Sequence, residues 1–352
     1  MNSLFRAKIA ISGPLGQKKE QISANANAIR RFSIPSARAL PYIVANMVST
    51  AVVIPTFNRC STLLFALSKL FSALPPAHRV IVIDSGSSDG TLDALMMRFP
   101  QAHAIEGSSS CWWAAATNLG IKKARELGCQ FVITYNDDNV ASADLFANLA
   151  LAAHSAPDSI IAAVCCYLDR PQTVFFAGRM RAKGSDRFYY LDHDVPLSAL
   201  GKGLRRVDML HGMCTLFPMA VFDKVGLFDE QAFPQVFADD DLLMRASRAA
   251  FPLQVALEAV VLNDRRKTGI NPYDHRLGPG GIHRLLTSRR STFQIAARTR
   301  FLWRYQRSFF FFCKTWLFDY LRLFTLVFAR WMLPFSAFHR LGIRWGHRLQ
   351  RR

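Results

Sequence analysis

Three clusters of acidic and amide side chains have the composition of a site that binds cations or moves protons. Asp84 opens the run Asp-Ser-Gly-Ser-Ser-Asp-Gly, Asn136 opens Asn-Asp-Asp-Asn, and Asp239 opens three consecutive aspartates. Adjacent carboxylates repel each other unless a cation or solvent relieves them. Oxygen ligands of this kind suit Mg²⁺ or Mn²⁺, which also bind substrate phosphates. A polar turn that caps the next helix remains the alternative for the first two clusters.

The third cluster stands at the start of a helical pattern over residues 237–251. The helix dipole and capping favour one or two acids at such a position, and three exceed that need. Crowding raises the pKa of at least one of the three carboxyls, which is what a general base requires. Helix capping and general-base catalysis both remain open for Asp239, Asp240 and Asp241.

Alternating strand and helix patterns place three polar clusters, PTFNR and the runs that begin at Asp84 and Asn136, at one edge of a sheet. Short apolar runs predict strands at 50–55, 78–84, 102–107, 129–135 and 159–168, and longer amphipathic runs predict helices at 58–74, 91–99 and 113–128. This alternation predicts an α/β fold with a doubly wound, mostly parallel sheet flanked by helices. In such sheets ligands bind beyond the carboxyl ends of the strands, where the polar clusters lie.

Net charge is concentrated at the two ends of the chain. The 352 residues carry a net charge of +19, but residues 1–46 hold seven bases and one acid, and residues 284–352 hold fifteen bases and one acid. The 22 bases and 23 acids between them nearly cancel. The seven cysteines form no Cys-x-x-Cys pair, which favours a reducing compartment over a disulfide framework or a zinc site.

The two basic ends have different composition. Residues 1–46 show no signal peptide and are expected to be a disordered tail that is dispensable for chemistry. Residues 308–338 are rich in Phe, Trp and Leu, but their longest uncharged run, 331–338, has eight residues, whereas a membrane span needs about 20. A basic amphipathic helix in the interface of an anionic membrane is expected, and a helix packed on the domain is the alternative.

Six motifs in unbroken order resemble family-2 glycosyltransferases with a GT-A fold, over about residues 48–305. The closest-looking branch is the rhamnosyl- and galactofuranosyl-transferase-like one. The motifs are AVVIPTFNR, VIVIDSGSSDGT, GSSSCWWAAATNLGIKKA, FVITYNDDN, HGMCTLFPMAVFDKVGLFDE and FADDDLLMRA. The resemblance implies a GT-A catalytic domain at 47–283, with a nucleotide-sugar half at 47–150 and an acceptor half at 151–283, followed by a membrane-associating region at 284–352.

The resemblance assigns a nucleoside pocket to the first two motifs. Carried over by position, it implies that Pro55, Thr56 and Arg59 line the pocket. It places Asp84 at the base or ribose, with Asp89 beside it.

The family's metal-binding Asp-x-Asp motif falls on Asn136, Asp137 and Asp138. Asp138 is the implied principal ligand, bridging Mg²⁺ or Mn²⁺ to the diphosphate of the donor, and Asp137 lies beside the donor. Asn136 stands where the motif has its first aspartate and is a weaker ligand. Asn263 and Asp264 occupy the place where some relatives have a metal-binding histidine.

The family's general base falls on Asp239, and its supporting acid falls on Asp241. The Glu that precedes the base in the family is Ala238 here, which leaves open whether Asp239 or Asp240 takes the proton. The resemblance places His211 and Gly212 in the acceptor-side loop.

The stretch CWWAAATNLG, residues 111–120, passes beside the donor in relatives. We expect Trp113 to wall the sugar or acceptor pocket and Asn118 to make a polar contact to the donor. The alanines would let the backbone and the helix N-terminus approach the diphosphate. Burial of both Trp112 and Trp113 in the core is the alternative.

The resemblance implies an inverting, metal-assisted transfer of a sugar from a UDP- or dTDP-sugar to a glycan or lipid-linked glycan acceptor, in cell-surface polysaccharide synthesis. The enzyme is expected in the cytoplasm, peripheral on the inner face of the cell membrane, without a nucleic-acid partner. One alternative is a nucleotidyltransferase, although PTFNRCST lacks the Gly-rich, lysine-bearing loop of that class. The other is a non-catalytic protein whose basic ends bind membranes or nucleic acid.

Overall fold

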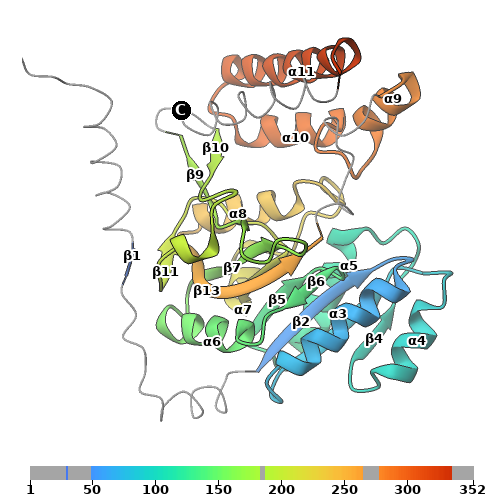
Figure 1. The fold of residues 1–352 in the computed structure, drawn as a ribbon, viewed down its shortest axis with the longest axis vertical. Helices are drawn as coiled ribbons and strands as arrows, with labels where there is room; N and C mark the ends of the chain where they lie inside the picture. Colours follow the sequence, from blue (N-terminus) through green and yellow to red (C-terminus); the bar gives the residue numbers. More distant parts are fainter. Residues whose placement is uncertain (1–28, 31–48, 183–186, 265–276, 335–352) are drawn as a thin grey trace, which may run out of the picture.

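The first half of the protein alternates strands and helices, as Figure 1 shows. The computed structural model describes residues 29–30, 49–182, 187–264 and 277–334. The elements of this half are β1 (Ile29–Arg30), β2 (Thr50–Thr56), α3 (Cys60–Ala73), β3 (Arg79–Asp84), α4 (Thr91–Arg98), β4 (His103–Glu106), α5 (Trp113–Glu126), β5 (Phe131–Tyr135), β6 (Asn139–Ala141) and α6 (Leu145–Ser155).

The second half adds shorter strands and ends in helices. Its elements are β7 (Ile160–Tyr167), β8 (Val174–Phe176), β9 (Arg179–Arg181), β10 (Phe188–Tyr190), the 3₁₀ turn η1 (Leu197–Ala199), β11 (Leu204–Arg206), β12 (Cys214–Pro218), α7 (Met219–Val225), α8 (Ala238–Arg248), β13 (Leu253–Asn263), α9 (Pro279–Thr287), α10 (Ile295–Tyr305) and α11 (Phe309–Met332). The region that showed no regular pattern in the sequence thus contains β8 to β11.

One sheet runs through the molecule in the order β1-β11-β13-β7-β12-β5-β2-β3-β4. Strands β5, β2, β3 and β4 are parallel neighbours, and β7 is parallel to β13. Strand β12 is antiparallel to both β5 and β7 and joins the two parallel groups. The predicted α/β fold, a mostly parallel sheet flanked by helices, is confirmed.

Alternation along β2 distributes side chains to two hydrophobic layers. Val52 and Ile54 belong to the layer that contains α3 and α6, including Leu67 and Phe146. Val53 points into the other layer, which contains residues of α5, α7 and α8. Because successive strand residues face opposite sides, one apolar run serves both layers. All seven residues of β2 are buried.

Helix α5 lies very close to the sheet. A Cβ atom on Gly120 would lie 2.3 Å from Val53 Cγ1 and 2.7 Å from Ile83 Cδ1, so only glycine fits there. Ala114 and Ala116 are fully buried in the same layer. The small residues of CWWAAATNLG therefore allow close helix–sheet packing. The approach of the N-terminus of α5 to a donor diphosphate stays a prediction.

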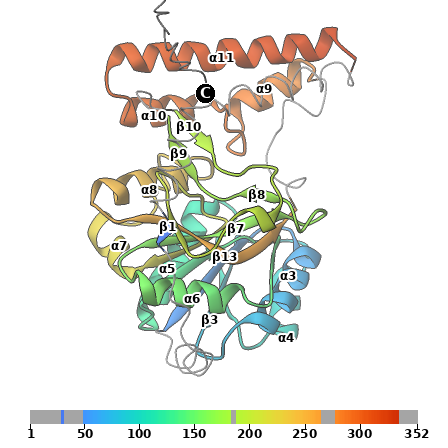
Figure 2. The ribbon, with the colours of Figure 1, turned by 60° about the vertical axis from the view of Figure 1, so that its left-hand side comes forward.

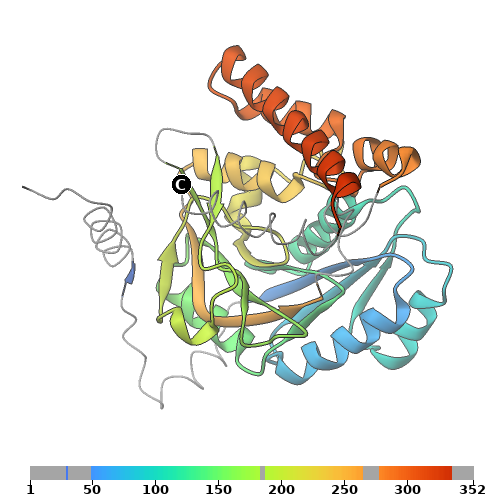
Figure 3. The same cartoon turned by 45° about the horizontal axis from the view of Figure 1, so that its top comes forward.

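The C-terminal helices α9, α10 and α11 lie together on one side of the sheet domain, next to α8 (Figures 2 and 3). Leu285, Tyr320, Leu323 and Val327 form a separate small core between α9 and α11. None of the helices in the described ranges combines the length and apolar character that crossing a membrane requires.

The predicted N-terminal tail, residues 1–46, lies outside the described residues except for Ile29 and Arg30, which pair with β11. The part of the predicted amphipathic segment beyond residue 334 also lies outside them. The proposed boundary between the catalytic domain and the C-terminal region at residue 283 falls inside α9 and stays a prediction.

Candidate active site

The carboxyl ends of β2 and β5 meet at a buried pair of aspartates. Thr56 Oγ1 donates a hydrogen bond to Asp137 at 2.9 Å. Arg59 bridges the pair, with 2.7 Å from Nη1 to Asp137 and 3.1 Å from Nη2 to Asp138. The side chains of Asp137 and Asp138 are 6% and 5% exposed, and Arg59 is the cationic partner of both.

The amide of Asn263 brings the end of β13 to the same place. Its Nδ2 donates to Asp138 Oδ1 at 2.8 Å and to Asn139 Oδ1 at 2.9 Å. Asn136 is linked to α5, because Trp113 Nε1 donates to its Oδ1 at 3.4 Å. Strands β2, β5 and β13 and helix α5 thus contribute to one polar cluster.

The donor chemistry of this cluster suits Mg²⁺ or Mn²⁺. Asp137 and Asp138 offer carboxylate oxygens, and Asn136 offers an amide oxygen. Within the described part of the chain, no group of three or more His, Cys, Asp or Glu is arranged to hold a metal. Mg²⁺ commonly binds through one or two carboxylates together with substrate phosphates. Asp137 and Asp138 can supply these carboxylates.

The second acidic cluster lies in the first turn of α8, after Phe237, whose φ of 64° starts the helix from a left-handed conformation. Asp239 accepts a hydrogen bond from Gly212 N at 2.9 Å. Burial and then the charge of Asp240 raise the pKa of Asp239 to about 6. Asp240 forms an ion pair with Arg179 of β9. These environments distinguish the two residues, since Asp240 is held by a cation and Asp239 is not.

Asp241 has a different environment and is fully buried. It accepts from Arg245 Nε at 2.9 Å, from Arg304 Nη1 at 2.7 Å and from the hydroxyl of Tyr305 at 2.7 Å. These donors make Asp241 unsuited to accept a proton itself. Its expected role as the acid that supports the base stays a prediction. Asp241 joins α8 to α10.

Trp113 lies between the two acidic clusters. Its indole NH contacts Asn136, and a Cβ atom on Gly212 would lie 2.9 Å from its Cη2 and 3.3 Å from Asp239 Cβ. Its ring also meets Phe228 edge-on, with 5.2 Å between centroids. The adjacent ring, Trp112, lies under the guanidinium of Arg289 at 5.1 Å. The two tryptophans are half-buried and serve different contacts, which excludes burial of both in the core.

Asn118 does not lie free at a donor pocket. Its Oδ1 accepts from Phe228 N at 3.0 Å, and its Nδ2 donates to Phe228 O at 3.0 Å and to Glu230 at 2.7 Å. The side chain is 3% exposed. The expected donor contact is wrong for this residue, because its amide fastens α5 to the loop after α7.

His211 is half-buried and packs against Phe176, with 3.6 Å between ring centroids. Its Nδ1 accepts from Met213 N at 3.3 Å, while Nε2 has no hydrogen-bond partner. Burial and then the charge of Arg179 lower the pKa of His211 to about 3, so it stays neutral at neutral pH. His211 and Gly212 lie shortly before β12, and Gly212 lies beside Asp239. The acceptor-side role expected for them stays a prediction.

The first polar cluster is organised by its own loop. Asp84, buried at the end of β3, accepts from Ser87 N at 3.2 Å and from the hydroxyl of Ser87. Asp89 accepts from Cys60 N at 3.0 Å, which lowers its pKa and ties the loop to α3. Pro55 is buried in β2 opposite Ile83.

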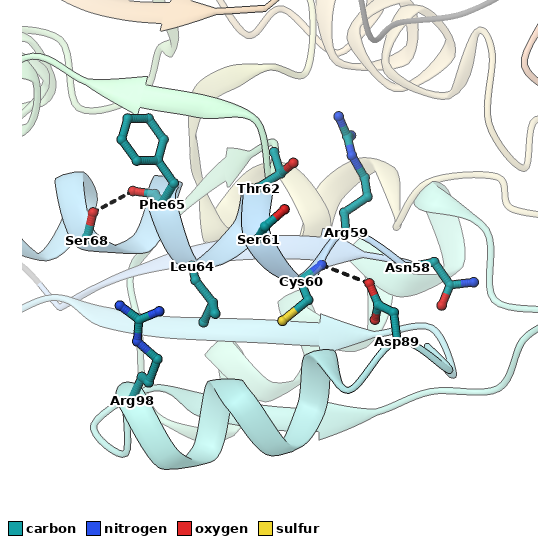
Figure 4. Close-up of a pocket in the computed structure, with 10 residues that line it drawn as sticks. All are labelled: Asn58, Arg59, Cys60, Ser61, Thr62, Leu64, Phe65, Ser68, Asp89 and Arg98. Carbon is teal, nitrogen blue, oxygen red and sulfur yellow. Dashed lines mark hydrogen bonds between the residues drawn. The ribbon is translucent and has the colours of Figure 1, made fainter.

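A pocket of about 700 Å³ adjoins this loop on the outer side of α3 (Figure 4). Asn58, Arg59 and Asp89 form one wall, and Leu64 and Arg98 line the opposite part. The side chain of Arg59 points away from Leu64 and Arg98 in Figure 4, in keeping with its bonds to the aspartate pair. Only Arg59 and Asp89 among the expected nucleoside residues line this pocket.

Sequence reasoning missed Arg179 and the pair Arg304 and Tyr305. Arg179 comes from the short strand β9, and Arg304 and Tyr305 come from α10. Each contacts an aspartate more than 60 positions away in the chain. The stretch FAGRMR contained the only local signal, two arginines among apolar residues before the acceptor-side loop.

Solved structures with the same architecture are GT-A glycosyltransferases. The mannosyltransferase PcManGT from Pyrobaculum calidifontis, solved with GDP-Man and Mn²⁺, is 16% identical, with 94% of this chain and 88% of that chain covered and a TM-score of 0.52. GalNAc-T7, solved with UDP, GalNAc and Mn²⁺, is 13% identical, with 72% of this chain covered and a TM-score of 0.51. The chain spans about half, 53%, of GalNAc-T7. At these identities the likeness shows the fold alone.

The family assignment comes from the sequence. The model of glycosyl transferase family 2 matches residues 51–225, which run from β2 to α7 and contain the aspartate pair. The search of curated proteins gave no significant match. The chain belongs to glycosyltransferase family 2.

Proposed function

We propose that this protein transfers a sugar from a nucleotide-sugar donor to a glycan or lipid-linked glycan acceptor, with inversion at the anomeric carbon. The observation that carries the proposal is the position of Trp113, which contacts Asn136 beside the aspartate pair and packs against Gly212 beside Asp239. The side chain of Trp113 thus lies between the proposed diphosphate site at the aspartate pair and the proposed base, Asp239. Family membership and the GT-A fold support the same reaction class.

Asp239 is the proposed general base. Its pKa of about 6 leaves it mostly ionised at neutral pH yet able to accept a proton. The acceptor hydroxyl gives its proton to Asp239, and its oxygen forms a bond to the anomeric carbon while the bond from that carbon to the diphosphate breaks. Attack from the face opposite the leaving group inverts the configuration. Arg179 holds the neighbouring Asp240 as a paired carboxylate and favours Asp239 for this role.

The donor is proposed to lie across the ends of β2, β3 and β5. Thr56, Arg59, Asp84 and Asp89 would hold the nucleoside, with Pro55 shaping the strand end beneath it. UDP- and dTDP-sugars are the first donors to test. We place the chain in the rhamnosyl- and galactofuranosyl-transferase-like branch on its motifs, with a role in cell-surface polysaccharide synthesis.

Asp138, with Asn136, is proposed to hold Mg²⁺ or Mn²⁺, and Asp137 lies beside the donor. When bound, the metal supplies positive charge to the departing diphosphate. Arg59 forms ion pairs with both carboxylates. The two relatives solved with Mn²⁺ support this choice of metal.

The cellular site proposed for this reaction is the cytoplasm, at the inner face of the cell membrane. A lipid-linked acceptor would be presented there. The basic C-terminal region, with fifteen bases and one acid in residues 284–352, supports a peripheral association.

The substitution Asp239→Asn tests the assignment of the base. Transfer should fall at least about a thousandfold, because the amide cannot accept the proton. Thermal shift with UDP- or dTDP-sugars and Mn²⁺ should remain near that of the wild type, since Asp239 does not contact the donor cluster. Asp240→Asn is the matched control and should retain far more activity. Near-normal turnover by Asp239→Asn would show that another group is the base.

A further inference from the structure

Helix α11 has two apolar stripes, and only one of them is covered. Tyr320, Leu323 and Val327 are buried against α9, where they meet Leu285. The other stripe, which we term the outer face of α11, consists of side chains that are 48% to 69% exposed: Phe310, Leu317, Leu321, Phe324, Phe328 and Trp331. Their intervals of three, four or seven residues place them on one side of the helix.

The outer face belongs to the main apolar patch on the described surface. Of the seventeen large hydrophobic residues exposed there, eleven lie between Trp303 and Met332, so the exposure is concentrated in one segment. Such concentration is typical of an interaction surface, whereas single exposed apolar residues are ordinary.

The charge around this face selects between possible occupants. Lys314 and Arg322 are exposed on α11, and the single acid of the region, Asp319, forms an ion pair with Arg298. Residues 335–352 contribute five more arginines and no acid to the sequence. A second copy of the chain would oppose this charge with the same sign, whereas anionic lipid headgroups would neutralise it.

We propose that the outer face of α11 docks on an anionic lipid bilayer, with the helix axis in the plane of the interface. The helix has 24 residues and is about 36 Å long at 1.5 Å per residue. Its aromatic and leucine side chains would enter the boundary between headgroups and acyl chains, while its bases contact the headgroups. The proposal rests on the proposed function only in naming the partner that would present a lipid-linked acceptor.

The bonds between α10 and α8 connect this surface to the candidate active site. Helix α11 packs on α10 through the ion pair of Arg298 and Asp319 and through Trp316 Nε1, which donates to Thr299 at 2.9 Å. Arg304 and Tyr305 of α10 hold Asp241, two residues from the proposed base. Docking would therefore fix the orientation of the first turn of α8 relative to the bilayer.

Co-sedimentation of the full-length protein with vesicles tests the surface. We expect binding to vesicles of phosphatidylcholine and phosphatidylglycerol, and much weaker binding to phosphatidylcholine alone or at high salt. The double variant Leu321→Ser with Phe328→Ser should bind at least about tenfold more weakly, because two exposed apolar side chains are lost. The matched control is Met96→Ser with Met97→Ser on α4, where both residues are also exposed. It should bind as the wild type does.

Three outcomes would overturn the proposal. The wild type could fail to sediment with anionic vesicles, the Leu321 and Phe328 variant could sediment unchanged, or sedimentation velocity could show a dimer that this variant alone dissociates. Circular dichroism and thermal unfolding establish that the variants are folded.

Release of nucleotide from a UDP- or dTDP-sugar with Mn²⁺, measured without vesicles, separates this proposal from the proposed function. Vesicle binding without nucleotide release from any donor would contradict the enzyme assignment and leave the docking surface intact. Nucleotide release without vesicle binding would contradict the docking surface alone.

Discussion

The carboxylates at the edge of the sheet are buried or half-buried and bonded to donors, whereas the bases of the C-terminal helices are mostly exposed. Asp137, Asp138 and Asp241 have Arg59, Arg245 or Arg304 as partners. On α11, Lys314 and Arg322 face solvent beside exposed phenylalanines. A buried charge must be compensated within the fold, while an exposed charge can be compensated by whatever the protein meets. Single substitutions should therefore affect stability and turnover at the edge of the sheet, and association at the helices.

The largest effect on stability is expected at the junction of the two regions. Asp241→Ala should lower the free energy of unfolding by about 1.5–3 kcal/mol, because it removes the buried carboxylate that accepts hydrogen bonds from Arg245, Arg304 and Tyr305. Chemical denaturation measures the loss. Asp229→Ala is the control, since Asp229 also pairs with Arg304 but is 31% exposed, and it should cost less than about 1 kcal/mol. Equal losses would show that Asp241 is not the principal link.

Gly212 tests how tightly the edge of the sheet is packed. Gly212→Ala places a methyl group 2.9 Å from Trp113 Cη2 and should cost about 1–3 kcal/mol of unfolding free energy. Turnover should fall as well, because Asp239 lies against the same atoms. Gly280→Ala in α9 is the comparison, since a Cβ atom there meets nothing within 4 Å and should change stability by less than about 1 kcal/mol. If Gly212→Ala changed neither the free energy of unfolding nor turnover, the close contact between Gly212 and Trp113 would be contradicted.

The pH dependence of transfer should report on Asp239. The base must be ionised, so kcat/KM should be maximal above pH 6 and fall about tenfold per unit below it. Asp240→Asn removes a like charge, which lowers the pKa of Asp239 and moves the acidic limb to lower pH. Asp93→Asn, on the exposed side of α4, is the control and should leave the acidic limb of the kcat/KM profile at the same pH. A shift to higher pH in Asp240→Asn would contradict the proposed coupling.

The smallest effect is expected where Arg289 covers Trp112. Arg289→Ala should lower the free energy of unfolding by about 0.5–1 kcal/mol, through loss of a cation–π contact at 5.1 Å. Arg290→Ala removes the same charge from the neighbouring exposed position and should have no comparable effect. Equal effects would mean that charge, not the contact with Trp112, accounts for the loss.

The fold was largely predictable because its signals are local. The predicted helix at 113–128 corresponds to α5, Trp113–Glu126, and the predicted helix at 237–251 corresponds to α8, Ala238–Arg248. The convergence of Thr56 and Arg59 on Asp137 also follows from local patterns, since parallel strands end at one edge of a sheet. The roles given to these residues in binding and catalysis stay predictions.

The remaining features depend on contacts between distant segments. Asn118 matches the family motif, yet its partner Phe228 is 110 positions away, and no local pattern shows that its amide is occupied. Asp240 and Asp241 are adjacent in sequence and differ only because Arg179 reaches one and α10 reaches the other. Residues of one type in one run can therefore serve different purposes, which only their three-dimensional surroundings distinguish.

The link between Asp241 and α10 has a consequence for protein engineering. A chimera that exchanges residues 295–332 for another targeting segment would remove Arg304 and Tyr305, two of the three side chains that donate hydrogen bonds to buried Asp241, and leave Arg245 as the remaining partner. The C-terminal helices therefore cannot be replaced independently of α8, even though they have their own small core. A working graft must carry equivalents of Arg304 and Tyr305 or replace Asp241 with a neutral residue at the same time.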